Sequence, residues 1–131
     1  MTPRTVKNLI GVHPQLVAII TSSWTQLDKK LAAIGIRPEI ICGLRPQAEQ
    51  DRLYAQGRSR PGKIVTWTRV SKHNTGHAVD FGLFCLTTGK YLDEADPKRA
   101  RAGYSLIAEI LTPWKIKHGR SFGDDPHFEL R

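Results

Sequence analysis

The chain has 131 residues, and its 20 Lys and Arg against 12 Asp and Glu give a formal charge of +8. This length suits one domain with its own core, so we expect a single domain over residues 1–131 and no separate binding module. No stretch reaches the roughly 18 apolar residues of a membrane span. The charge favours nucleic acid, anionic lipid or the acidic cell envelope as partners without choosing among them, and a merely soluble basic surface is the alternative.

The first segment with a regular pattern begins at Pro14, where apolar residues recur at helical spacing. We expect this helix to end at Gly35 and Pro38, and its apolar stripe to be core. The residues of the stripe are Leu16, Ile20, Trp24, Leu27 and Leu31. Before it, residues 1–7 lack the apolar run and small-residue cleavage pattern of a secretory signal, so we expect the chain to be made and kept in the cytoplasm.

Residues 39–43 have the pattern of a short buried strand, and Pro46 then begins a second helix that runs to Gly57. Arg45 is thus placed between a strand and a helix, where working residues are common. Residues 58–62 are basic and contain Gly and Pro, which indicates a mobile loop.

A further strand is expected over residues 64–67, and a central strand that carries Asp80 is expected over residues 77–84. His73 and Asp80 are seven residues apart, and in one continuous strand their side chains would point to opposite faces. Gly76 can adopt backbone angles closed to other residues, and it therefore can bend His73 back toward Asp80.

Residues 86–96 read as a polar hairpin or loop, and Pro97 begins a helix with Tyr104, Ile107 and Leu111 on one face. Residues 127–130 form a closing strand. This order predicts an α+β fold, a single compact domain with a small antiparallel sheet flanked by helices. Cys42 and Cys85 lie in apolar runs without C-x-x-C spacing, so free thiols are expected.

Two short segments, residues 71–80 and 124–127, contain the side chains that could bind a metal ion. Catalytic zinc needs about three protein ligands from His, Asp, Glu or Cys and one open position for water. His73, Asp80 and His127 satisfy this requirement. His77 forms an i, i+4 pair with His73, but Gly76 argues against a helix there, so we interpret His77 as a non-ligand that lines the cleft.

Asp124 and Asp125 are both candidates for a general base beside the metal, and residue chemistry alone does not separate them. The other of the pair would be a turn residue. Glu129 shares a strand face with His127 and either orients its imidazole or is an ordinary exposed residue. Arg45 could hold a substrate carboxylate or an oxyanion, with a surface salt bridge as the alternative.

These segments resemble one known family. Ser71, His73, Gly76, Ala78 and Asp80 match its S-x-H-x-x-G-x-A-x-D signature, and residues 124–128 are similar to its D-x-P-H-F segment. Residues 8–14, 43–46 and 53–58 extend the likeness over essentially the whole chain. The chain is therefore identified as similar to the zinc D-Ala-D-Ala carboxypeptidase/L-alanyl-D-glutamate peptidase family (VanY-like), and in style to its phage endolysins.

The resemblance implies a Hedgehog/DD-peptidase-like fold and one zinc ion per chain, held by His73, Asp80 and His127. It implies that Asp124 is the general base and acid, that Arg45 binds or polarises substrate, and that Ser71 binds substrate. The expected substrate is the peptidoglycan stem peptide, cut at the L-Ala–D-Glu bond. The expected protein is a monomer that associates with the anionic cell envelope but not with nucleic acid, and stays in the host cytoplasm until it is released to lyse the cell wall.

Two other functions stay open from the sequence, and a third is disfavoured. The same site chemistry suits a D,D-carboxypeptidase that removes terminal D-Ala, and the same fold suits a non-catalytic cell-wall-binding module, although such a module would not need Asp124. A metal-dependent nuclease would need an oxygen-rich Mg²⁺ site that we do not find. Asp93, Glu94 and Asp96 could bind a regulatory calcium ion, with a solvated loop as the alternative.

Overall fold

The computed structural model describes residues 1–66 and 68–131, which form a four-stranded antiparallel sheet with the strand order β1-β2-β4-β3. The strands are β1 Ile36–Cys42, β2 Ala78–Cys85, β3 Ile116–His118 and β4 His127–Leu130. The helices are α1 Pro3–Asn8, α2 Pro14–Ala32, α3 Gln47–Ala55, α4 Leu92–Ala95 and α5 Pro97–Leu111, with short 3-10 turns η1 Lys72–Thr75, η2 Thr112–Trp114 and η3 Gly119–Phe122. The predicted α+β fold is confirmed.

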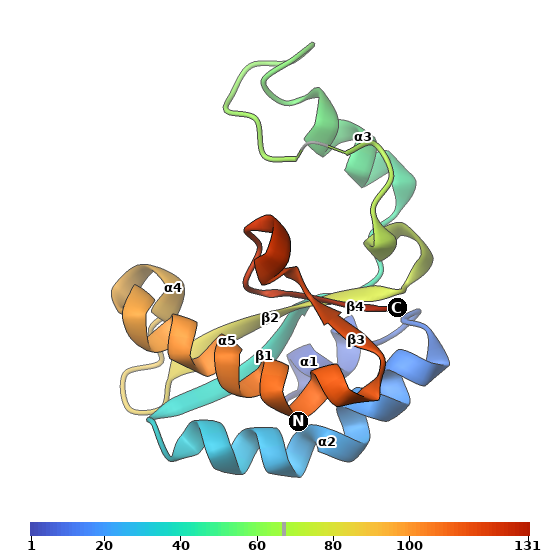
Figure 1. The fold of residues 1–131 in the computed structure, drawn as a ribbon. Coiled ribbons are helices and arrows are strands. Elements are labelled where there is room, and N and C mark those ends of the chain that lie inside the picture. Colours follow the sequence, from blue (N-terminus) through green and yellow to red (C-terminus); the bar gives the residue numbers. More distant parts are fainter. Residues whose placement is uncertain (67) are drawn as a thin grey trace.

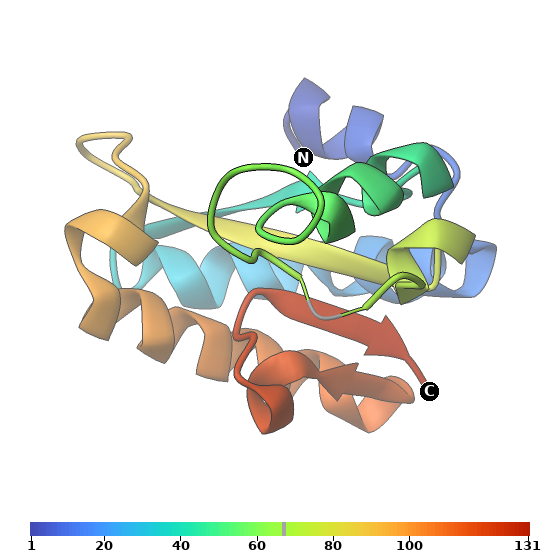
Figure 2. The same ribbon diagram turned by 90° about the horizontal axis from the view of Figure 1, so that it is seen from above.

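The two faces of the sheet differ because side chains alternate along each strand. Val79, Phe81 and Leu83 of β2 and Phe128 of β4 are fully buried. They belong to the core that α2 and α5 complete on one side of the sheet (Figures 1 and 2). The alternate residues of β2 and β4, Asp80 among them, therefore point to the opposite side.

The predicted helix from Pro14 is confirmed, and its five predicted core residues are all buried. The expected end at Gly35 and Pro38 is wrong in part, because α2 ends at Ala32 and β1 already begins at Ile36. Pro38 lies inside β1 and pairs with Leu83. Proline is tolerated there because β1 is an edge strand, so that the missing N–H leaves no neighbouring strand without a donor.

Helix α1 covers part of the opposite face of β1 through Glu39, which is 3% exposed. Its carboxylate accepts hydrogen bonds from Thr2 and Thr5 and pairs with Arg37. Burial by itself raises the pKa of Glu39, but these contacts together outweigh burial and lower that pKa below its ordinary value. Neither α1 nor the three-residue strand β3 was predicted from the sequence.

Helix α3 and the loop after it form an arm, residues 47–66 and 68–70, which projects from the body (Figure 1). The predicted second helix is confirmed, although it ends at Ala55 before Gly57. The strand expected over residues 64–67 is wrong for Ile64 to Thr66, which are irregular, and Trp67 lies outside the described residues. The arm is too far from the sheet for this β-branched run to find a partner strand.

The remaining predictions concern the C-terminal half. Helix α5 begins at Pro97 and buries Tyr104, Ile107 and Leu111, as predicted. The polar segment 86–96 is a turn followed by the short helix α4.

Cys42 and Cys85 are free thiols, as predicted. Within the described ranges, no helix has both the length and the apolar character that crossing a membrane requires.

Candidate metal centre

The centre is built on the register of two strands. Asp80 of β2 is directly opposite His127 of β4, and Cys42 of β1 is opposite Asp80 on the other side. Cross-strand partners share a face and lie close together. The His127 Nδ1 atom accordingly lies 3.4 Å from Asp80 Oδ1. Sheet pairing therefore joins residues that are 47 positions apart in the sequence.

His73 is brought to the same carboxylate by η1 rather than by a strand. The Ser71 hydroxyl accepts a hydrogen bond from the His73 N–H at 3.2 Å and so caps η1. Gly76 ends η1 with φ +74°, and a Cβ at this position would meet the carbonyl oxygen of Gly11 at 2.5 Å. The chain then enters β2, and His73 Nε2 lies 3.2 Å from Asp80 Oδ1. The bend expected at Gly76 is confirmed.

Hydrogen bonds to the outer ring nitrogens fix how the two imidazoles face Asp80. His73 Nδ1 donates to the Gly43 carbonyl at 2.8 Å, and His127 Nε2 donates to Glu129 at 2.9 Å. These contacts leave His73 Nε2 and His127 Nδ1 as the nitrogens directed at Asp80. A carboxylate or carbonyl behind a ligand imidazole is the usual outer support of a metal site.

The charges of the centre favour a cation. Burial by itself lowers the pKa of both imidazoles and raises that of Asp80, but the contacts among the three groups, together with those to Cys42 and Glu129, outweigh burial. The pKa of His73 is raised to about 10, that of His127 is raised, and that of Asp80 is held well below its usual range. Positive charge beside Asp80 is therefore stabilised, whether it is carried by a proton or by a metal ion.

Two overlapping groups of ligand atoms meet at Asp80. One consists of Asp80, Asp124 and His127, and the other of Cys42, His73 and Asp80. Both mix nitrogen or sulfur with carboxylate oxygen, which suits zinc better than calcium or magnesium. Cys42 was not predicted as a candidate; its Sγ lies 3.8 Å from His73 Nδ1, the nitrogen that already bonds Gly43. The alternation of side chains along β1 did not indicate that Cys42 faces Asp80, because a bulge shifts the register between Ile40 and Cys42.

The structure distinguishes the two adjacent aspartates that the residue chemistry left equal. Asp125 accepts hydrogen bonds from Arg120 Nε at 2.8 Å and from Arg120 Nη2 at 3.1 Å. Asp124 has a side chain that is 50% exposed, and its Oδ2 lies 4.0 Å from His127 Nδ1. Burial and the nearby Asp80 charge raise the pKa of Asp124, whereas Arg120 lowers that of Asp125. Asp124 is thus the carboxylate available for proton transfer.

Arg45 is held at the edge of the centre by a buried glutamine. Its Nη1 donates to Gln50 Oε1 at 2.8 Å, and its Nη2 lies 3.6 Å from Cys42 Sγ. Gln50 is fully buried and donates in turn to the Thr68 carbonyl at 2.8 Å. Sequence reasoning missed Gln50, since a glutamine one turn into a helix carries no signal of burial. Its contacts fix the direction of the Arg45 guanidinium.

One cleft of about 700 Å³ between the arm and the sheet is lined by Arg45, His73, Asp80, Asp124 and His127. Ser71, Arg45 and Asp124 all contribute to its wall. Ser71 is already engaged in capping η1, and its expected contact with substrate stays a prediction. His77 bonds Thr75 through Nδ1 at 2.8 Å and is not among the residues that line this cleft, so its interpretation as a cleft residue is wrong.

The acidic group considered for calcium lies elsewhere, on α4 and its junction with α5. Asp93 accepts a hydrogen bond from the Tyr104 hydroxyl at 2.7 Å. Asp96 caps α5 through the Arg99 N–H and pairs with the Arg99 side chain. Among the described residues, this group does not bring its ligand atoms together as the centre at Asp80 does.

Comparison with known proteins gives two informative likenesses. The chain is 42% identical over 126 residues to the peptidoglycan L-alanyl-D-glutamate endopeptidase CwlK of Bacillus subtilis (strain 168), across 91% of this chain and 73% of CwlK. The crystal structure of the L-Ala D-Glu endopeptidase ChiX of Serratia marcescens matches with a TM-score of 0.71 and 27% identity, across 100% of this chain and 89% of ChiX. VanYB in complex with D-Alanine-D-Alanine is a more distant match, with a TM-score of 0.48 and 17% identity. No family model matches the chain.

Proposed function

Because the chain belongs to the D-Ala-D-Ala carboxypeptidase/L-alanyl-D-glutamate peptidase family, we propose that it hydrolyses the L-Ala–D-Glu bond of peptidoglycan stem peptides. The single observation that carries the proposal is the convergence of His73, His127 and Asp124 around Asp80 in an open cleft. The names of CwlK and ChiX support the L-Ala–D-Glu bond over a terminal D-Ala.

The proposed metal is one zinc ion with His73, Asp80 and His127 as ligands. Two fixed imidazole nitrogens and one carboxylate oxygen fit the preferences of catalytic zinc, and the open side of the cleft leaves a position for water. When bound there, zinc supplies a Lewis acid that makes water nucleophilic at neutral pH. Asp124 is placed to accept the proton of the attacking water and to pass it to the leaving amine.

Arg45 acts on the substrate rather than on the metal in this proposal. A guanidinium that Gln50 holds in place can bind a substrate carboxylate or stabilise the developing oxyanion without first having to be ordered. Glu129 and Gly43 keep the two imidazoles in the tautomers that ligation needs.

The experiment is mass spectrometry of purified peptidoglycan after digestion, with Asp124→Asn as the inactive control. New N-terminal D-Glu with intact stem ends is expected. Free D-Ala as the sole product would show a D,D-carboxypeptidase instead, and binding without any new terminus would show a non-catalytic module.

A separate measurement tests the metal. Elemental analysis should find about one zinc per chain, and a strong chelator should abolish activity that added zinc restores. Full activity after exhaustive chelation, or another metal at one per chain, would contradict the zinc assignment.

The biological setting is the part of the proposal that rests on motif resemblance alone. Like the phage endolysins, the protein would stay in the host cytoplasm until it is released, and then lyse the cell wall as a monomer. Its formal charge of +8 is consistent with binding to an anionic envelope. Expression in a bacterial host should leave cells intact until the inner membrane is permeabilised, and lysis without permeabilisation would contradict this setting.

A further inference from the structure

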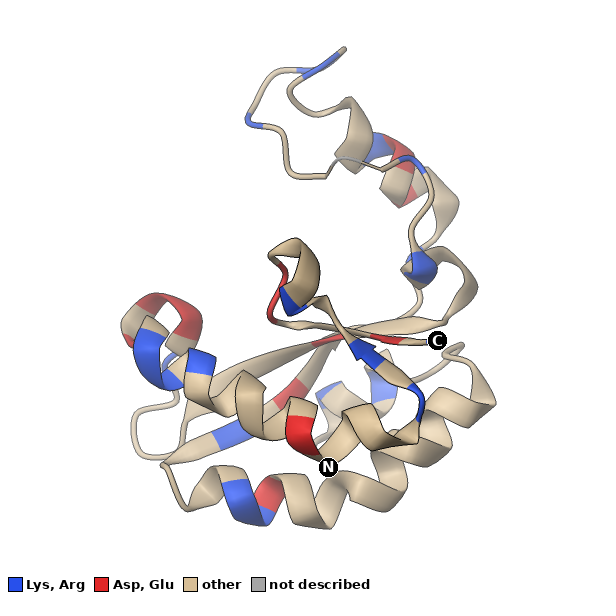
Figure 3. Cartoon of the chain, in the orientation of Figure 1, with Lys and Arg blue, Asp and Glu red and all other residues tan. Residues whose placement is uncertain are grey.

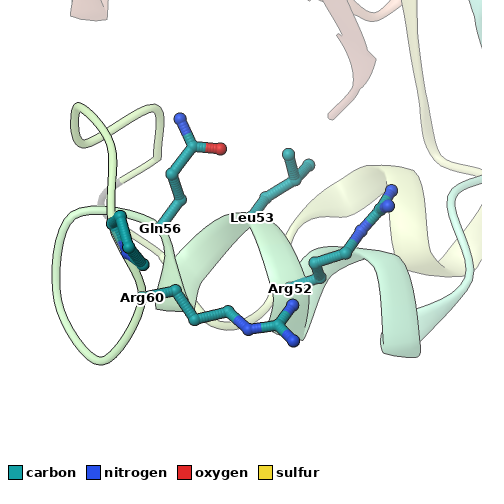
Figure 4. Close-up of a pocket in the computed structure, with 5 residues that line it drawn as sticks. Arg52, Leu53, Gln56 and Arg60 are labelled. Carbon is teal, nitrogen blue, oxygen red and sulfur yellow. The ribbon is translucent and has the colours of Figure 1, made fainter.

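The arm carries a second concave surface next to the cleft. This arm pocket has a volume of about 500 Å³ and is lined by Arg52, Leu53, Gln56, Arg60 and Pro61. Figure 4 shows Arg60 extending from the loop back along α3, toward the end of the pocket where Arg52 lies. Leu53 lines the arm pocket and the metal cleft alike, so the two hollows adjoin.

The two arginines of the arm pocket carry positive charge that a ligand could bind. The only ion pair of Arg52 among the described residues is with Glu49 at 3.8 Å, and both side chains are largely exposed. For Arg60, the described part of the chain contains no ion-pair partner. Across residues 47–70 five Lys and Arg face two Asp and Glu, and Figure 3 shows blue segments along the arm. Such a concave, positively charged surface selects an anion.

The spacing between Arg45 and the arm pocket matches the length of a short peptide. Helix α3 begins two residues after Arg45 and rises about 1.5 Å per residue, so its C-terminal end lies on the order of 10 Å farther along the wall. An extended peptide spans about 3.3 Å per residue, and three residues bridge this distance. A substrate whose scissile carbonyl contacts Arg45 can therefore place a second anionic group near the arm pocket.

We propose that Arg52 and Arg60 bind the terminal carboxylate of the stem peptide, and that they thereby select peptides that carry this charge. This inference rests on the proposed function, because the peptide must first lie in the metal cleft. A guanidinium pairs well with a carboxylate, and Leu53 and Pro61 provide an apolar edge for the adjoining side chain.

The test compares two soluble tetrapeptides that begin with L-Ala–D-Glu and end in D-Ala, one with a free C-terminal carboxylate and one with a C-terminal amide. The wild-type protein should cleave the carboxylate peptide with a kcat/KM about tenfold higher. The double variant Arg52→Gln/Arg60→Gln should lose this preference, mainly through KM, and should cleave the amide at the wild-type rate. The matched control is Lys30→Gln/Lys98→Gln, which removes the same charge from exposed positions on α2 and α5 and should keep the preference.

Each remaining outcome overturns the inference in a distinguishable way. Equal cleavage of both peptides by the wild type refutes the arm pocket while the proposed function stands, and no cleavage of either peptide or of peptidoglycan refutes both. An equal loss on both peptides in the arm variant, with an unchanged melting temperature, shows general charge steering instead of recognition of the terminal carboxylate. A loss that appears only on whole cell walls, and disappears once anionic polymers are stripped, shows that the arm binds those polymers instead.

Discussion

Replacing Asp124 by Asn tests the proposed chemistry most directly, because the amide keeps the shape of the side chain but cannot accept a proton. General acid–base groups contribute about 10²- to 10⁴-fold to rate, so we expect kcat to fall by that factor. The Asp124 side chain is half exposed, and the described residues give it no hydrogen bond of its own. Its loss should therefore leave the zinc content and the melting temperature unchanged.

Asp125→Asn is the matched control, since it makes the same chemical change one residue away. This substitution weakens the two-point contact with Arg120, whose guanidinium also donates to Ser105 and to the Arg101 carbonyl. Hydrogen bonds to charged groups contribute about 1.5–3 kcal/mol, and partial exposure of this pair reduces that to about 1–2 kcal/mol. A melting temperature lower by about 3–8 °C is expected, with a nearly unchanged kcat at 25 °C.

The assay measures tetrapeptide cleavage, zinc content and thermal unfolding on the same preparations of both variants. If Asp125→Asn loses activity and Asp124→Asn does not, the assignment of the base is wrong. If Asp124→Asn loses zinc together with activity, Asp124 is a metal ligand, as its place in the ligand group with Asp80 and His127 would allow.

Three further substitutions probe the scaffold around the site. Gln50→Leu should lower kcat/KM about tenfold with zinc retained, because Arg45 loses its charge-assisted hydrogen bond; unchanged peptide kinetics would show that Gln50 does not orient it. Glu39→Gln should reduce the free energy of unfolding by about 1–3 kcal/mol at pH 7, as measured in urea. Because the folded pKa of Glu39 is lowered, its contribution is fully present above the ordinary value of 4.5 and is lost as pH falls through the folded pKa, so wild type and variant should converge in acid. Gly76→Ala should destabilise the fold by about 2 kcal/mol or more, since φ is +74° and the Cβ would meet backbone at Gly11; wild-type stability would show that this turn can relax.

The sequence predicted the central residues of the site better than the residues that surround them. The pattern around His73, Asp80 and His127 singled out three side chains that the structure brings together, because short motifs with unusual residue types stand out. Gln50 and Cys42 were missed because their roles depend on how α3 is enclosed by the loop and on a bulge in β1, and neither is visible in local periodicity. The register between β2 and β4, which places Asp80 opposite His127, is likewise a long-range property that local periodicity does not reveal.

The errors along the chain have a common physical origin. Ile64 to Thr66 has strand propensity, but a strand needs a neighbour, and the arm lies away from every edge of the sheet. Pro38 looked like a helix terminator, and it is tolerated in β1 only because this strand lies at an edge. In both cases tertiary position, rather than propensity, decided the structure.

The cleft lies between two walls, the sheet and the arm, that differ in stability. One wall is β2 and β4, whose core side chains are fully buried, whereas α3 packs closely against no other helix or strand among the described residues. Segments with few buried apolar contacts open at a smaller free-energy cost than the core. Amide hydrogens of α3 should therefore exchange with solvent faster than those of β2. The cleft can then widen around a peptide attached to a bulky, cross-linked polymer while His73, Asp80 and His127 keep their geometry.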